Sequence, residues 1–156
     1  MGKPEFVYTT YINTTPERLW QALTDPAITR RCWRGLTFDS DWKPGSTVTV
    51  RYPEHDVTIA DPAQVVLESE PGKRLSYTWH TFTPRWAAVS GFSDELLARF
   101  SAERRSKVTF DIEDLGETAR LTVVHDDFES GSAVLEAVTK GWPRLLAELK
   151  TFLETN

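Results

Sequence analysis

Alternating apolar and polar residues predict several β-strands that each have one buried face. Residues 5–12 (EFVYTTYI) start the pattern with β-branched and aromatic side chains, which favour strands. The same alternation returns in later segments, predicted as strands at 47–52, 63–70, 74–82, 107–113 and 119–125. Because a short turn with a glycine at 114–117 joins the last two strands, we expect them to form an antiparallel hairpin.

Two short helices are predicted directly after the first strand. The segment TTPE at 14–17 combines a capping threonine, a first-turn proline and an early glutamate, which is typical of a helix start. Asp25 and Pro26 repeat this signal, so a second helix should follow and extend to about Arg31.

The C-terminal segment, residues 130–154, is predicted as one long helix. Its apolar residues recur every three or four positions and therefore share one helix face: Val134, Val138, Trp142, Leu145, Leu149 and Phe152. Ser130 or Ser132 can cap the first turn. Gly141 and Pro143 oppose helix continuity, but the apolar face stays in phase across them. We expect a kink there instead of a break.

Residues 84–104 fit the strand rhythm poorly. The segment Ser93-Asp94-Glu95, followed by the apolar residues Leu96 and Leu97, predicts a short capped helix inserted between two strands. A long connection of this kind in a compact domain is commonly either functional or mobile. This insertion is therefore a candidate lid.

Composition limits the class of protein. The 156 residues suit a single domain, residues 1–156, and 40% apolar with 26% charged residues is typical of a globular protein. The longest unbroken apolar run is residues 86–89, far shorter than the ~20 residues of a membrane helix, so no membrane span is expected. The N-terminus lacks the apolar region of a secretory signal. A net charge of −5 argues against a nucleic-acid partner, and a single cysteine fits a cytoplasmic location.

Aromatic residues are unusually frequent, at 12% of the chain with six tryptophans. Aromatic side chains bury large areas on few rotatable bonds, so they can fill a core or line an apolar cavity. For any single tryptophan, core packing is the more common role.

The order of the predicted elements is one strand, two short helices, a run of antiparallel strands and one long helix. Short segments carry a further likeness: TTPERLWQALTDP at 14–26, SDWKPGS at 40–46, RLSYTWH at 74–80, SKVTFDIE at 106–113, ARLTVVHDDFE at 119–129 and GWPRLLAELKTFLE at 141–154. The chain resembles the START-like (SRPBCC, helix-grip) superfamily, and within it bacterial single-domain proteins similar to the C-terminal domain of the activator of heat shock protein 90 ATPase. The resemblance implies an α+β fold in which a curved antiparallel sheet wraps around the C-terminal helix.

The resemblance implies several functions and selects none of them. START-like domains often bind hydrophobic small molecules or lipids between sheet and helix, and some relatives are cyclases or hydrolases. The two-domain chaperone activator suggests a protein-interaction role, although 156 residues leave no room for its N-terminal domain. No catalytic motif of the superfamily transfers residue by residue to this chain.

Known catalytic and cofactor motifs are missing from the sequence. The glycines form neither a dinucleotide-binding G-x-G-x-x-G, nor a P-loop, nor a G-x-S-x-G nucleophile turn. His55, His80 and His125 are too far apart for a local metal motif, so no cofactor or metal is expected. Cys32 lies among arginines that could lower its thiol pKa, but a catalytic cysteine without a motif around it is much the weaker hypothesis.

Two polar residues on the predicted inner face of the sheet leave alternatives open. His125 follows Leu121 and Val123, so it is either a structural group near a strand end or a polar anchor at a pocket mouth. Tyr77 lies between Leu75 and Trp79, so it is either a core aromatic or a hydroxyl that points into a cavity.

The leading hypothesis is a non-catalytic domain that binds an apolar or lipid-like small molecule between the sheet and the C-terminal helix. The candidate lining residues are Trp33, Tyr77, Trp79, Phe110, His125, Val138, Trp142 and Leu145. The alternatives are a protein-interaction module and, third, a small-molecule cyclase or hydrolase, which would need polar groups that converge inside the cavity.

Overall fold

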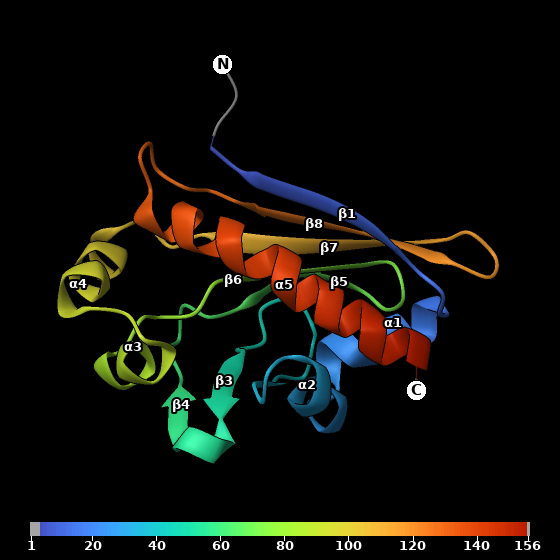
Figure 1. Ribbon diagram of the computed structural model, residues 1–156, viewed down its shortest axis with the longest axis horizontal. Helices are drawn as coiled ribbons and strands as arrows, with labels where there is room; N and C mark the ends of the chain where they lie inside the picture. The colour runs from blue at the N-terminus through green and yellow to red at the C-terminus, as the bar shows by residue number, and fades with distance from the viewer. Residues whose placement is uncertain (1–3, 156) are drawn as a thin grey trace.

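A five-stranded antiparallel sheet and one long helix form the centre of the fold (Figure 1). The computed structural model describes residues 4–155. The strand order is β1-β8-β7-β6-β5, with β1 Phe6–Ile12, β5 Val66–Glu70, β6 Arg74–Thr78, β7 Lys107–Asp114 and β8 Ala119–Asp126. The long helix α5 is Ala133–Thr155 and lies along the sheet. The predicted α+β helix-grip fold is confirmed.

The two faces of the sheet differ as the alternation predicts. Leu121 and Val123 of β8 are fully buried on the inner face. On the outer face, Arg74 of β6 forms an ion pair with Asp111 of β7 at 2.7 Å. The predicted hairpin is also confirmed, since β7 and β8 pair antiparallel.

The two predicted N-terminal helices are α1, Pro16–Thr24, and α2, Pro26–Cys32. Each begins with a proline, and each is capped by the side chain before it. The Thr15 hydroxyl accepts a hydrogen bond from the backbone N–H of Arg18 at 3.2 Å, and the Asp25 carboxylate accepts one from Ala27 at 3.0 Å. These caps satisfy N–H groups that a helix start leaves unpaired.

A second, smaller sheet was not predicted. It contains β2 Thr37–Asp39, β3 Thr49–Tyr52 and β4 Val57–Ile59, with a short 3-10 turn at Pro53–His55 between the last two. β2 and β4 are three residues long, which is too short for alternation to be visible in the sequence.

The insertion forms two helices, where the sequence predicted one. The predicted helix is α4, Asp94–Ala102, and an additional helix, α3, is Pro84–Ser90. The start of α3 repeats the signal of α1, since the hydroxyl of Thr83 caps the helix and a proline follows. The threonine and proline at 83–84 are visible in the sequence, but no helix was predicted from them.

Helix α5 is continuous through Pro143, and Ser132 caps it. The Ser132 hydroxyl accepts a hydrogen bond from the backbone N–H of Leu135 at 3.0 Å. The carboxylate of Glu103, directly after α4, accepts hydrogen bonds from the backbone N–H groups of Ala133 at 2.7 Å and Val134 at 3.4 Å. A negative charge at this end also interacts favourably with the helix dipole.

Candidate functional site

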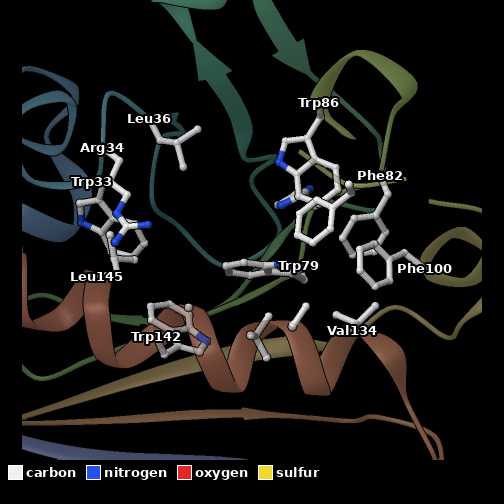
Figure 2. Close-up of a pocket in the computed structure, with 15 residues that line it drawn as sticks. Trp33, Arg34, Leu36, Trp79, Phe82, Trp86, Phe100, Val134, Trp142 and Leu145 are labelled. Carbon is white, nitrogen blue, oxygen red and sulfur yellow. The ribbon is translucent and has the colours of Figure 1, made fainter. Parts of the chain in front are cut away.

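A pocket of about 260 Å³ lies between the first half of α5, the α3–α4 segment and the loop after α2 (Figure 2). This volume is slightly below the ~300 Å³ at the lower end of typical small-molecule sites. The described lining residues are mostly aromatic or aliphatic: Trp33, Arg34, Leu36, Trp79, His80, Phe82, Trp86, Phe92, Phe100, Val134, Ala137, Val138, Gly141, Trp142 and Leu145.

Five of the predicted lining residues surround this pocket: Trp33, Trp79, Val138, Trp142 and Leu145. Three of them, Val138, Trp142 and Leu145, lie on the face of α5 that is directed toward α3 and the loop after α2. Trp79 follows the end of β6 and lies centrally, with Trp142 below it and Trp86 on the opposite side (Figure 2). These five residues therefore lie around one cavity, on its helix wall and its floor.

The other predicted residues, Tyr77, Phe110 and His125, do not line the pocket. Phe110 is fully buried, and its ring centroid lies 5.8 Å from that of Trp142, behind the pocket wall. Tyr77 is 2% exposed and packs against Phe38 and Trp42, and this burial raises the pKa of its phenol. Both predictions were wrong, because the inner face of the sheet packs against the solid core at Tyr77 and Phe110 and does not border the pocket there.

His125 is a buried structural residue. The indole N–H of Trp142 donates a hydrogen bond to Nδ1 of His125 at 3.1 Å, so Nε2 carries the proton. Nε2 lies 2.8 Å from the hydroxyl oxygen of Ser106, which accepts this proton in a second hydrogen bond. Burial lowers the pKa of His125 to about 3, with smaller contributions from His80 and Lys107. The prediction of a polar anchor at a pocket mouth was wrong for this residue.

His80 is the histidine that lines the pocket. Its Nδ1 lies 2.9 Å from the carbonyl oxygen of Thr81. Since a carbonyl oxygen only accepts, Nδ1 carries the proton and Nε2 is left as a hydrogen-bond acceptor. Burial lowers the pKa of His80 to about 4, the Thr81 carbonyl partly offsets this, and the positive charge of Arg105 lowers it further.

His80 was not predicted as a lining residue, because the alternation of β6 was extended beyond the end of the strand. That alternation places His80 with Ser76 and Thr78 on the outer face. The strand ends at Thr78, so the alternation no longer fixes the direction of residues after it. Alternation therefore does not assign a face of the sheet to residues that follow the end of a strand.

Aromatic residues of the insertion, together with Phe82 just before it, supply the wall opposite α5. Phe82, Trp86, Phe92 and Phe100 lie with ring centroids between 5.1 and 6.4 Å apart. They pack with Phe128 and the first turns of α5 in a cluster separate from the main core. The insertion therefore builds part of the pocket.

Two of the lining tryptophans, Trp33 and Trp142, present apolar rings to the pocket because their N–H groups are bonded elsewhere. The indole N–H of Trp33 donates to the carbonyl oxygen of Ala22 at 3.0 Å, and that of Trp142 donates to His125. Among the described lining residues, the charged or titratable side chains are Arg34 and His80.

Cys32 does not belong to the pocket lining. It is buried, and burial raises the pKa of its thiol to about 12. A thiol with this pKa is protonated at neutral pH, and the thiolate is the reactive form. The hypothesis of an activated cysteine was wrong.

An antiparallel sheet packed against a long C-terminal helix, with a pocket beside that helix, is the arrangement of a START-like domain of the helix-grip class. The family model described as "Activator of Hsp90 ATPase homolog 1-like protein" matches residues 13–154. The chain therefore belongs to this family, and the resemblance found in the sequence is confirmed. No curated protein gives a significant match.

Solved structures share this fold at low sequence identity. Protein MLL2253 of Mesorhizobium loti is 24% identical with a TM-score of 0.73, and the match covers 98% of this chain and 99% of that one. CalU16 of Micromonospora echinospora is 17% identical with a TM-score of 0.65, covering 97% and 76%. PFC0360w, an HSP90 activator of Plasmodium falciparum, is 18% identical with a TM-score of 0.67, covering 96% and 95%. These likenesses concern the fold.

Proposed function

We propose that this protein binds an apolar small molecule in the pocket between α5 and the α3–α4 segment. The observation that carries the proposal is the pocket lining, in which aromatic faces surround a cavity and the N–H groups of Trp33 and Trp142 are bonded elsewhere. Each Å² of apolar surface moved from water into such a site contributes about 25 cal/mol. The acceptor Nε2 of His80 can orient a ligand hydroxyl or amine.

The two alternatives have less support. A cyclase or hydrolase needs several converging polar groups, whereas the described lining offers Arg34 and His80. A chaperone-related interaction module would use the outer face of the sheet. That face carries ion pairs such as Arg74–Asp111, with exposed Val7 and Tyr11 on the edge strand. Within the described residues, no helix is long and apolar enough to cross a membrane.

Filling the pocket is expected to abolish ligand binding. Val138 lines the pocket, so Val138→Trp places an indole in the cavity. We expect affinity for the uncharged fluorescent probe N-phenyl-1-naphthylamine to fall at least about tenfold, a loss of ~1.4 kcal/mol. The measurement is a fluorescence titration of the variant and the unaltered protein.

Val7→Trp provides the matched control, because Val7 is 54% exposed on the outer face of the sheet. This variant adds the same side chain without entering the pocket, and its affinity should stay within about twofold of that of the unaltered protein. Equal affinities for all three proteins would rule out this pocket as the binding site.

The insertion is expected to respond to the ligand. Helix α3 buries Ala87 alone among its residues, so its amides should exchange hydrogen faster than those of β7 in the free protein. N-phenyl-1-naphthylamine should slow exchange in α3 if the segment acts as a lid. Hydrogen exchange with and without the probe tests this, and identical exchange in both states would mean that α3 is a fixed wall.

A further inference from the structure

The aromatic pocket adjoins a second cavity of about 440 Å³ between α4, α5 and the loop after α2. Both cavities are lined by Arg34, Phe92, Phe100, Ala137 and Gly141. Because five residues border both spaces, the two cavities lie side by side. We call the second cavity the basic groove, for the residues described next.

Four basic residues line the groove: Arg34, Arg99, Lys140 and Arg144. Glu136 is the acidic residue in its described lining. The whole chain, by contrast, has a net charge of −5. The groove therefore concentrates positive charge in an acidic protein, and such a concentration attracts anions.

The existing ion pairs leave part of this charge uncompensated. Arg34 donates two hydrogen bonds to the carboxylate of Glu148, at 3.0 and 3.3 Å. Lys140 lies 3.8 Å from Glu136. Arg99 and Arg144 form no ion pair with any of residues 4–155. Their guanidinium groups are available to an anion, which they can hold through paired N–H donors.

Gly141 borders both cavities. It lies inside α5, and a Cβ atom added at this position would meet no atom within 4 Å. Glycine is less favourable than alanine in a helix interior. The helix thus carries its smallest residue at the point where the aromatic pocket meets the basic groove.

We propose that the ligand is an apolar molecule with an anionic group, such as a carboxylate or sulfonate, whose charge lies in the basic groove beside Arg99 and Arg144. This inference rests on the proposed function. The apolar body occupies the aromatic pocket near Trp79 and Trp86, and Arg34 lies beside Trp33 at the edge of the same pocket (Figure 2). The two cavities together recognise the two parts of one molecule.

Two fluorescent probes with one ring skeleton test the inference. Anilinonaphthalene sulfonate is an aromatic anion, and N-phenyl-1-naphthylamine is the same skeleton without the sulfonate. In the double variant Arg99→Gln/Arg144→Gln, we expect about a fivefold loss of affinity for the anion and less than about a twofold change for the neutral probe. Added salt should weaken binding of the anion alone.

Lys73→Gln is the control, because Lys73 is an exposed cation outside both cavities. It should leave the affinities of both probes unchanged. Equal effects of the double variant on the two probes would overturn the inference while leaving the proposed function intact. If neither probe binds the unaltered protein, the proposed function fails and the inference fails with it.

Displacement of N-phenyl-1-naphthylamine distinguishes the two sources of such a ligand. Dodecanoate represents a lipid-derived acid, and naphthoate represents an aromatic acid. At least one acid should compete better than its uncharged alcohol, and that acid identifies the source. Equal competition within both acid–alcohol pairs would contradict a role for the anionic group.

Discussion

Replacing Trp142 with alanine is expected to destabilise the fold by at least ~3–5 kcal/mol, although the residue borders a cavity. The side chain is 3% exposed, and its ring packs against Trp33, Trp79 and Phe110 at centroid distances of 5.7 to 5.8 Å. The substitution also removes the indole N–H that Nδ1 of His125 accepts, and an unpaired buried acceptor costs a further ~1–3 kcal/mol. Urea unfolding measures the total decrease in the free energy of unfolding from both losses.

Trp142→Phe separates the two contributions. It keeps an aromatic ring and removes the N–H group, so its cost should approach that of the lost hydrogen bond. In a double-mutant cycle with His125→Leu, the two changes should be non-additive, because each removes the same interaction. Strict additivity would show that the hydrogen bond contributes nothing to stability. A cost of Trp142→Ala below about 2 kcal/mol would mean that the tryptophan only borders the pocket.

Acidification is expected to destabilise the protein through His80 and His125. Their folded pKa values, about 4 and about 3, lie below the ordinary value of 6.5. Between these values the unfolded chain binds more protons, so the free energy of unfolding falls as the pH falls. The contribution is complete above about pH 7, and its loss by pH 4 is on the order of 3 kcal/mol for each histidine.

His125→Gln isolates one of these contributions. Glutamine has both an acceptor for the N–H of Trp142 and a donor for Ser106, but it does not titrate in this range. Urea unfolding of both proteins at pH 7, 5.5 and 4 compares the slopes, whatever stability the variant has at pH 7. The slope of the variant should be shallower. Parallel curves would contradict a buried neutral His125.

The sequence predicted the fold well because its signals are local and repeated. The alternation in β7 and β8, the caps at Thr15 and Asp25, and the helical spacing of α5 each act over a few residues. The same signals placed Val138 and Trp142 on one helix face and hence on one wall of the pocket.

The opposite wall depends on contacts that no local pattern encodes. Tyr77 and Trp79 share a face of one segment, yet Tyr77 lies under the second sheet, whereas Trp79 lies in the pocket. Of the second sheet, which covers Tyr77, only β3 coincides with a strand predicted from the sequence, at 47–52. The aromatic wall of the insertion, including Trp86 and Phe100, depends on how α3 and α4 fold back on α5. Such packing across long sequence separations requires the three-dimensional structure.

The contact of Glu103 with α5 ties the insertion to the start of the long helix. The carboxylate follows α4 directly and accepts the first N–H groups of α5, about thirty residues further along the chain. A shortened chain with β6 joined directly to β7 would leave those donors unpaired and would also lose a wall of the pocket. Redesign of this protein for other ligands should therefore vary side chains within α3 and α4 and keep the segment's length.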